Sequence, residues 1–406
     1  MFRLNDTHLM IQDMFRQYMM KEIEPVINAV EDGEVPVFDP LRRMVETLGI
    51  RAQVESMDLS RPAPALAGAR EKREPDPDNP MEGMEIVAGN LLIKELARVS
   101  PGAAMSFGVT TGLAGGTILG KGTPEQKRAF GLPLLMLDQI GAWCLTEPGA
   151  GSDALGSMRT TAVEDGDFFV LNGSKTFITN GPVADVFVVY AKLERGGAGK
   201  EIQNFIVLRE DPGLSTGKPF EKMGMKASPT SEVFFEDCRI PRDRLIGGAR
   251  EKKSRDHVKE GLATERSGLP AMALGVIERC FEIAVRYARE RSQFGRPIIE
   301  FQLIQSRLAR MYVALENVRN IFLKTIEQTI YGGLTRLDVC AGKIYSSEMA
   351  TWVANEAISI LGGYGYMREY VIERLARDAK LLEIGAGTAE MQILTMGEEL
   401  ATNWRP

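Results

Sequence analysis

The chain has 406 residues, of which 26% are charged and 44% hydrophobic, and its formal net charge is −6. These values are typical of a soluble protein of two or three globular domains, and the acidic balance argues against a dedicated nucleic-acid binder. No apolar run approaches the roughly 20 residues of a membrane helix and no secretory signal opens the chain, so we expect a cytoplasmic protein without membrane or nucleic-acid partners.

The first part of the chain is predicted to be helical. Residues 90–99 (NLLIKELARV) and 123–135 (TPEQKRAFGLPLL) have the apolar spacing of amphipathic helices. Thr123 suits the N-cap of the second helix, and Pro124 suits its first helical position. The stretch 60–83 carries five prolines and many charges, which indicates a surface loop or lid.

From about residue 141 the sequence changes to short β-branched and aromatic runs, such as DFFVLNGSKTFITNG and ADVFVVYAKL, separated by turn residues. The dipeptides Asp165-Gly166 and Asn172-Gly173 are typical of β-hairpin turns. Such a series of strands within about a hundred residues predicts an antiparallel sheet or barrel.

After residue 250 the helical spacing returns. Apolar residues recur at helical intervals in two sets, Leu274, Ile277, Phe281, Ala284 and Ala288, and Leu308, Met311, Leu315, Val318 and Phe322. With further helical stretches at about 337–361 and 367–402, they predict a four-helix bundle. The predicted fold class is α+β multidomain, with an N-terminal helical domain (1–140), a middle antiparallel β domain (141–247) and a C-terminal helical bundle (248–406).

The chain is poor in side chains for metal binding or nucleophilic catalysis. Its four cysteines form no C-x-x-C pair, which is typical of a reduced chain without a disulfide framework or zinc site. The two histidines, His8 and His257, lie near a terminus and in a charged run, so we expect both to be solvated at the surface. We therefore expect no metal site, and any chemistry should depend on carboxylates and a cofactor.

Two glycine-containing segments are candidates for ligand contact. LTEPGAGSD (145–153) follows a predicted strand and can bring several backbone N–H groups to an anionic or polar ligand. It is neither a Walker A loop nor a dinucleotide fingerprint, and alone an ordinary tight turn explains it better. EIGAGT (383–388) interrupts a helical pattern with two glycines, at a cost of about 1 kcal/mol each relative to alanine.

Five segments in this order together resemble the acyl-CoA dehydrogenase family of flavoproteins: WCLTEPGAGSD (143–153), FITNG (177–181), RERSQFGRPIIEFQ (289–302), LGGYGY (361–366) and RDAKLLEIGAGT (377–388). The resemblance covers nearly the whole chain and matches the predicted order of helical, β and helical parts. It implies FAD held between the β domain and the C-terminal bundle of a homotetramer. It also implies oxidation of an acyl-CoA to a 2-enoyl-CoA, with an electron-transfer flavoprotein as the electron-accepting partner.

The resemblance assigns the flavin ring to two of these segments. Thr146 and the backbone of Leu145 would hydrogen-bond the pyrimidine ring. Phe177 stands where the family usually has a Trp against the flavin, and Thr179 would reach flavin N5. These expectations come from the family pattern, residue by residue.

The same resemblance implies contacts with phosphate groups. Ser152 would meet the FAD phosphate or the CoA, and Arg291 would grip the pyrophosphate of an FAD bound to a neighbouring subunit. Taken singly, Arg291 fits a surface ion pair and the glycines fit helix breaks equally well. The other implied cofactor contacts are Gly151, Phe294, Gln302, Gly362, Gly363 and Thr388.

Flavin-dependent dehydrogenation needs a carboxylate that removes the substrate α-proton, and burial would raise its pKa into the useful range. In many family members this acid directly precedes the Gly-Thr of the segment matching EIGAGT, where this chain has Ala386. Isovaleryl-CoA and long-chain members instead place a Glu immediately before an Arg on the first long helix of the bundle. GLATERSGLP (261–270) has that pattern, so we predict Glu265, directly before Arg266, as the base. A solvated glutamate near a helix start is the alternative.

The segment EIGAGT is similar to that of isovaleryl-CoA dehydrogenases. Gly385 and Ala386 would leave space in the pocket wall, which favours a branched or other bulky acyl group, and Ser152 and Arg266 complete the predicted substrate contacts. SPGAAMS (100–106) lacks the arginine of glutaryl-CoA members, which favours a monocarboxylic acyl group. The alternatives are an acyl-CoA oxidase or another flavin activity on this fold, such as decarboxylation or desulfination, and a catalytically inactive subunit or binding protein.

Overall fold

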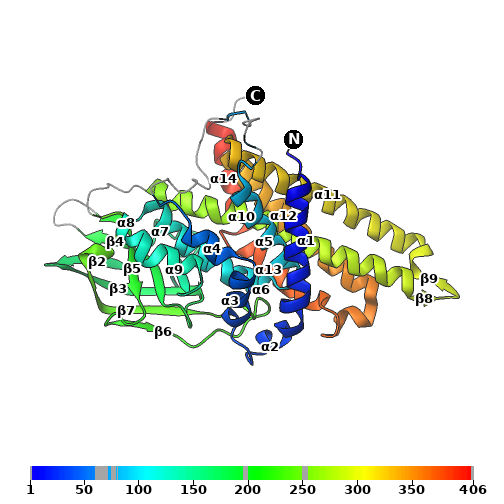
Figure 1. Cartoon of the computed structure of the whole chain (residues 1–406), viewed down its shortest axis with the longest axis horizontal. Coiled ribbons are helices and arrows are strands. Elements are labelled where there is room, and N and C mark those ends of the chain that lie inside the picture. The colour runs from blue at the N-terminus through cyan, green and yellow to red at the C-terminus, as the bar shows by residue number, and fades with distance from the viewer. Residues whose placement is uncertain are drawn as a thin grey trace.

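The computed structural model describes residues 2–59, 72–74, 79, 81–194, 200–248 and 255–403, with the side chains of the last segment described from residue 265 onward. Along these residues the chain forms a helical N-terminal part, a β-sheet and a C-terminal helical bundle (Figure 1). The predicted order of helical, β and helical parts is confirmed. The exact limits of the three domains stay a prediction.

The N-terminal part consists of short helices around two longer ones. Their bounds are α1 Asp6–Tyr18, α2 Ile27–Glu31, α3 Phe38–Thr47, α4 Ile50–Glu55, α5 Met84–Val99, α6 Pro101–Gly108, α7 Gly116–Lys121, α8 Pro124–Gln126 and α9 Leu132–Leu135. Thr123 is the N-cap of α8: its side chain accepts from Gln126 N at 3.3 Å, while the Gln126 side chain accepts from Thr123 N at 3.0 Å. The predicted cap is therefore confirmed. Most of the predicted 60–83 loop lies outside the described residues.

The prediction of a solvated His8 is wrong. The residue is 5% exposed, and its Nδ1 accepts a hydrogen bond of 3.2 Å from Asn5 N at the start of α1. Asn5 Oδ1 in turn accepts from His8 N, so the two residues cap the helix reciprocally. The imidazole is thus used as a structural acceptor, and burial lowers its pKa. The side chain of His257 lies outside the described residues.

The middle part is a seven-stranded sheet in the order β1-β4-β2-β3-β7-β6, with β5 paired to β4. The strands are β1 Gly141–Cys144, β2 Thr161–Asp165, β3 Phe168–Thr179, β4 Val186–Glu194, β5 Lys200–Leu208, β6 Leu214–Thr216 and β7 Thr230–Pro241. The pairings β2/β3, β3/β7, β4/β5 and β6/β7 are antiparallel as predicted, whereas β4 pairs with β1 and β2 in parallel. Strand β4 is buried on both faces, which explains its nearly continuous apolar sequence.

One of the two predicted hairpin turns is confirmed. Asp165-Gly166 closes the turn between β2 and β3, with Gly166 at φ +57°. Asn172-Gly173 lies inside β3 instead, at a register shift opposite β7. Gly173 has φ +144°, and a Cβ there would lie 2.7 Å from Thr160 Cα. This dipeptide therefore marks a β-bulge with a close backbone approach, which a local turn signal does not distinguish from a hairpin.

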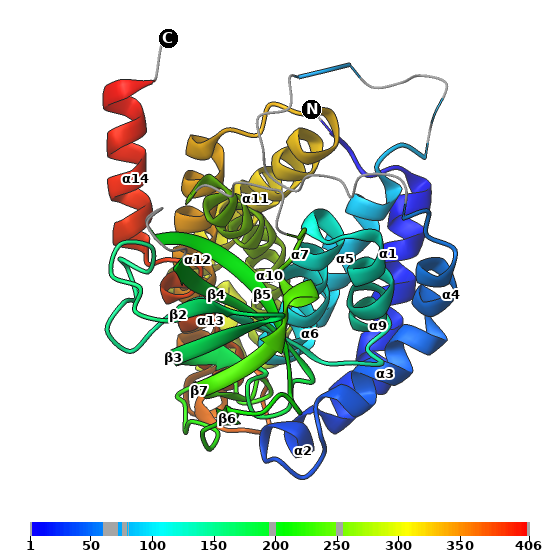
Figure 2. The same ribbon diagram turned by 90° about the vertical axis from the view of Figure 1, so that its left-hand side faces the viewer.

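The C-terminal bundle consists of α10 Arg255–Glu290, α11 Gln302–Tyr331, α12 Arg336–Leu361, α13 Ile372–Ile384 and α14 Ala389–Thr402. Both predicted apolar sets point into the core, with every member buried except the half-buried Phe281. The helix predicted over 367–402 is two helices, because the chain leaves the helical conformation at 385–388. Figure 2 shows α14 as the last helix at the edge of the bundle.

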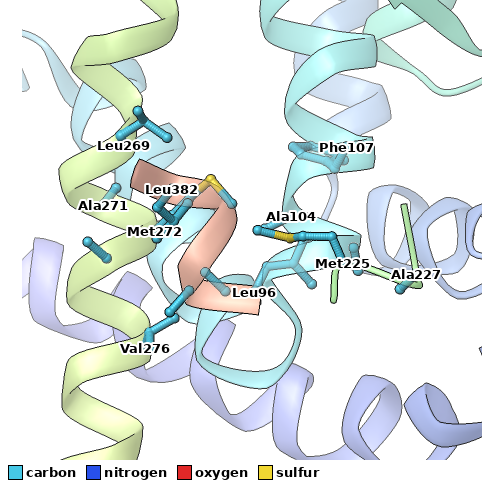
Figure 3. Packing of buried hydrophobic residues seen from close by; sticks show 14 of the residues in the cluster. Leu96, Ala104, Phe107, Met225, Ala227, Leu269, Ala271, Met272, Val276 and Leu382 are labelled. Atoms are coloured by element: carbon cyan, nitrogen blue, oxygen red, sulfur yellow. The ribbon is translucent and has the colours of Figure 1, made fainter. Parts of the chain in front are cut away.

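A single hydrophobic cluster joins the three parts of the chain. It includes Leu96 and Ala104 of the N-terminal helices, Met225 of the middle part, Met272 of α10 and Leu382 of α13, all close to fully buried. Figure 3 shows side chains of these parts converging between α6, α10 and α13. Because the three parts share one core, residues at their junction are held in fixed relative positions.

The four cysteines are buried and free. No helix of the described part of the chain has both the length and the apolarity needed to cross a membrane. Within the same residues, no cluster of three or more His, Cys, Asp or Glu side chains is arranged to hold a metal ion.

Candidate active site

The EIGAGT segment forms a defined turn between α13 and α14. Ala386 has φ +57° and Gly387 has φ +88°, so both adopt the left-handed conformation, whereas Gly385 is extended at φ −67°. A left-handed alanine is uncommon and persists only where the surroundings fix it. Thr388 then begins α14 as its N-cap, with Oγ1 accepting from Met391 N at 3.3 Å.

Three side chains from three different helices bind the carbonyl groups of this turn. Lys343 Nζ of α12 donates to the Glu383 carbonyl at 2.7 Å. Arg266 Nε of α10 donates to the Ala386 carbonyl at 2.8 Å, and Gln392 Nε2 of α14 donates to that of Gly387 at 3.2 Å. The Glu383 carbonyl belongs to the last turn of α13, which leaves its carbonyls without helical partners, and the other two carbonyls lie in the turn that follows.

Lys343 and Gln392 were not predicted from the sequence. Both are fully buried, at 0% exposure, although both are polar. A Lys at a core position of a helix is unusual, and this departure from the apolar pattern is the signal that could have indicated Lys343. Burial and the nearby positive charge of Arg266 lower the pKa of Lys343 to about 8.

Glu265 directly precedes Arg266 on α10 and is half-buried. Burial raises the pKa of its carboxyl group to about 7, although the positive charges of Arg266 and Lys343 oppose the rise. A carboxyl with a pKa near neutrality can take up and release a proton under ordinary conditions. Glu265 is thus joined through Arg266 to the turn at Ala386.

We expect Gly387→Ala to destabilise the protein by about 1–3 kcal/mol. Besides the strained φ, the new Cβ would lie 2.8 Å from Gln392 Nε2 and 3.1 Å from Arg266 Nη2. Urea unfolding of the purified apoprotein measures the change. Gly397→Ala is the matched control, because Gly397 lies within α14 with no atom near its added Cβ and should gain slight stability. Equal stability of the two variants would contradict the proposed packing of the turn.

The 145–153 loop follows β1, and its first residues are hydrogen-bonded to β3 of the sheet. Leu145 is 4% exposed, and its carbonyl accepts from Lys175 Nζ at 3.1 Å. The half-buried Thr146 accepts at its carbonyl from Thr176 N at 2.9 Å. Gly151, by contrast, is exposed, and a Cβ added there would meet no atom within 4 Å. Packing within this chain therefore leaves room for a side chain at position 151. The neighbouring Ser152 is also exposed.

Phe177 is held in an exposed and strained conformation. It has φ +57° at a register shift between β3 and β7, and the residue is 69% exposed. Its ring lies 5.7 Å from that of Phe220. The half-buried Thr179 follows at the end of β3, opposite Thr230. Strained backbone conformations cluster at active sites and ligand contacts, so the exposed Phe177 ring is a candidate ligand contact.

Asn180 holds the end of the FITNG segment (177–181) in place, and the sequence analysis did not predict it as a site residue. It is fully buried at φ +64°, and its Nδ2 donates to the carbonyls of Ser106 and Gly141, both at 3.0 Å. These bonds tie the FITNG turn to α6 and to the start of β1. Ser106 and Gly141 are distant from Asn180 in the sequence, so no local pattern indicates these bonds.

A third group of predicted residues lies at the other end of the molecule. Arg291 is exposed, with its guanidinium 5.9 Å from the centre of the Tyr364 ring. Phe294, which is 95% exposed at φ +53°, occupies the turn between β8 Ser292–Gln293 and β9 Arg296–Pro297. Figure 1 shows β8 and β9 at the opposite end of the long axis from the sheet. A single chain therefore does not bring these residues together with Phe177.

The remaining predicted residues of this third group are also exposed. They are Gln302 at the first position of α11, and Gly362 and Gly363 directly after α12. Gly362 has φ +61°, and a Cβ on either glycine would meet no atom within 4 Å. The open glycines lie in the same region as Arg291 and Tyr364.

The residues present are compatible with FAD. An exposed aromatic side chain at Phe177 can stack on an isoalloxazine ring, and the exposed guanidinium of Arg291 can pair with a pyrophosphate. Gly151 and Gly362 each have open space where a Cβ would be. The two sets lie far apart in one chain, as expected if each FAD is shared between two copies.

Three family models cover most of the chain: the N-terminal domain of acyl-CoA dehydrogenases matches residues 81–136, the middle domain 142–238 and the C-terminal domain 256–401. A mitochondrial 2-methylacyl-CoA dehydrogenase of Solanum tuberosum is 42% identical over 76% of this chain and 74% of its own length. The mitochondrial isovaleryl-CoA dehydrogenase of Oryza sativa subsp. japonica is 40% identical over 76% and 75% of the two chains.

A solved structure extends this similarity to the whole chain. The butyryl-CoA dehydrogenase of Megasphaera elsdenii is 32% identical, with a TM-score of 0.85 over 99% of this chain and 100% of that one. The family models, the relatives and this fold agree with one another. The chain therefore belongs to the acyl-CoA dehydrogenase family of FAD-dependent oxidoreductases.

Proposed function

We propose that the protein removes the α- and β-hydrogens of an acyl-CoA thioester with a branched or bulky acyl group, and passes the electrons to an electron-transfer flavoprotein. One observation carries the proposal. The turn that holds the catalytic acid in many family members has Ala386, while Glu265, with a pKa of about 7, lies beside the arginine that binds this turn.

In this proposal Glu265 removes the α-proton of the thioester. Its raised pKa makes the carboxylate a competent base near neutral pH and lets it keep the proton afterwards. Bound FAD supplies the acceptor for the hydride that leaves the β-carbon. Arg266 orients the Ala386 carbonyl and places positive charge beside the base. Because both residues belong to α10, the base and the turn keep a fixed relative geometry.

Cofactor binding is proposed to need two copies of the chain. Leu145, Thr146, Phe177 and Thr179 would contact the flavin end of one FAD, with Gly151 and Ser152 nearby. Arg291, Phe294 and Gln302 of a second copy would contact its pyrophosphate and adenosine end, with Gly362, Gly363 and Thr388 as further contacts. The separation of the two sets along the molecule and the exposure of Phe294 support this arrangement. We propose a homotetramer as the working form.

The acyl group is proposed to be branched or otherwise bulky. Gly385 and Ala386 have at most one side-chain carbon each, so the turn presents little bulk to a substrate. The two relatives named for 2-methylacyl-CoA and isovaleryl-CoA support the same substrate class. Ser152 and Arg266 are the proposed polar contacts at the substrate.

Anaerobic mixing of the FAD-loaded protein with a panel of acyl-CoA thioesters tests the proposal. We expect flavin bleaching with branched short-chain thioesters such as isovaleryl-CoA and 2-methylbutyryl-CoA, and slower bleaching with straight-chain ones. Bleaching by straight-chain thioesters alone would contradict the branched substrate class. No bleaching with any thioester would favour an inactive subunit, and rapid reoxidation of the substrate-reduced flavin by oxygen would favour an acyl-CoA oxidase.

A further inference from the structure

A buried ion pair lies beneath the 145–153 loop. Lys175 of β3 is fully buried, and its Nζ donates to Glu147 Oε1 at 2.9 Å. The same ammonium donates to the Leu145 carbonyl at 3.1 Å. Glu147 is 5% exposed, so solvent screens this pair little. The lysine thus connects the sheet to both the side chain and the backbone of the loop.

The carboxylate of Glu147 is hydrogen-bonded at both oxygens. Oε1 also accepts from Thr160 N at 2.9 Å, and Oε2 accepts from Arg159 N at 2.6 Å. Burial alone would raise the pKa of Glu147, but the Lys175 charge and the hydrogen bonds from Thr160 Oγ1, Lys175 Nζ and Arg159 N hold it below its usual range. The pair therefore joins three segments, namely the loop, β3 and the residues that lead into β2.

Backbone hydrogen bonds at two places also hold the first residues of the 145–153 loop. Glu147 and Ala150 exchange backbone hydrogen bonds of 3.2 and 3.0 Å across a tight turn. Thr176 N, next to Lys175, donates to the Thr146 carbonyl at 2.9 Å. The ion pair is thus the side-chain part of a network that fixes the path of the chain through Leu145 and Thr146.

A buried ion pair adds little net stability over apolar side chains of the same volume, so stability alone does not explain its presence. We propose that Lys175 and Glu147 are positioning residues for FAD, which fix the backbone of Leu145 and Thr146 in the geometry that binds the flavin ring. This inference rests on the flavin contacts of Leu145 and Thr146 given under the proposed function. Lys175 and Glu147 act through the loop and need not touch the cofactor.

Titration of apoprotein with FAD, followed by flavin fluorescence, tests the inference on three variants. Lys175→Met removes one charge and the bond to the Leu145 carbonyl. K175M/E147Q removes both charges and keeps one acceptor oxygen for the N–H groups of Arg159 and Thr160, so no unpaired charge is buried. Lys94→Met is the matched control, because Lys94 is 2% exposed and pairs with Glu278 at 3.0 Å between α5 and α10, away from the loop.

We expect Lys175→Met to lower the Tm of the apoprotein and to raise the FAD dissociation constant at least tenfold. K175M/E147Q should recover most of the Tm yet keep the tenfold weaker binding. Lys94→Met should lower the Tm and change the FAD dissociation constant less than twofold. If Lys175→Met does not fold, the double variant alone decides between positioning and stability.

FAD binding by K175M/E147Q within twofold of the wild type would overturn the inference, since the pair would then serve stability only. The same holds if Lys94→Met weakens FAD binding as much as Lys175→Met does. Failure of the proposed function has a different signature. In that case the wild-type protein binds FAD normally, but no thioester bleaches it.

Discussion

Glu265→Gln should bind FAD as the wild type does and lose flavin reduction by acyl-CoA by a factor of about 10²–10⁴. The amide has nearly the same volume as the carboxylate but cannot accept the substrate α-proton. Anaerobic stopped-flow measurement of flavin bleaching gives the rate, and the flavin spectrum before mixing gives the FAD content. A near-normal rate in this variant would remove Glu265 from the mechanism.

The pH dependence of the wild type adds an independent test of the same residue. The base must be ionised to act, so the bleaching rate should rise with pH and level off above the carboxyl pKa of about 7. Folding stability should change with pH in the opposite direction to the bleaching rate. Because the pKa is raised in the folded state from an ordinary value of 4.5, stability should fall as pH rises from about 4.5 to 7. Glu265→Gln should remove that part of the stability loss.

Glu390→Gln is the matched control for this variant. Glu390 is an exposed carboxylate in the first turn of α14, close to the same turn of the chain. Its replacement should leave both the bleaching rate and its pH midpoint unchanged. A comparable rate loss in Glu390→Gln would indicate that any charge change near the turn disturbs the site.

Arg266→Met should slow flavin reduction about ten- to hundredfold and move its pH midpoint upward. The substitution removes the charged hydrogen bond to the Ala386 carbonyl, and charged hydrogen bonds contribute about 1.5–3 kcal/mol. It also removes a positive charge that lowers the pKa of Glu265, so the carboxyl should ionise only at higher pH. Bleaching rates across a pH series measure both effects.

Two further variants separate charge from geometry at this position. Arg266→Lys keeps the positive charge, so it should restore most of the pH midpoint while the rate stays low. Arg336→Met removes an exposed arginine of α12 that pairs with Glu399 at 3.7 Å, and should change neither quantity. An unchanged rate and midpoint in Arg266→Met would contradict the role given to Arg266.

Local patterns predicted the regular elements well where one physical rule decides them. The apolar spacing of α10 and α11 follows from burying one helix face, and the capping box at Thr123 needs only residues three positions apart. The errors occur where a local signal has two structural outcomes. Asn172-Gly173 fits a hairpin turn or a bulge, and only the pairing of β3 with β7 selects the bulge. His8 was misplaced because its position near a terminus suggested solvent, whereas its imidazole takes part in the cap of α1.

The sequence by itself determined the family, because five motifs in order cover nearly the whole chain, and it indicated Glu265 through the missing acid at Ala386. Only the tertiary structure decided how the site is held. Arg266 reaches a carbonyl 120 positions away, Lys343 reaches one 40 positions away, and Lys175 bonds to Leu145 and Glu147 across 30 and 28 positions. Such contacts depend on how helices and strands pack, and no spacing along the chain encodes that packing directly. Buried polar groups must find these partners, so the fold rather than the motif fixes the geometry of the turn and of the loop.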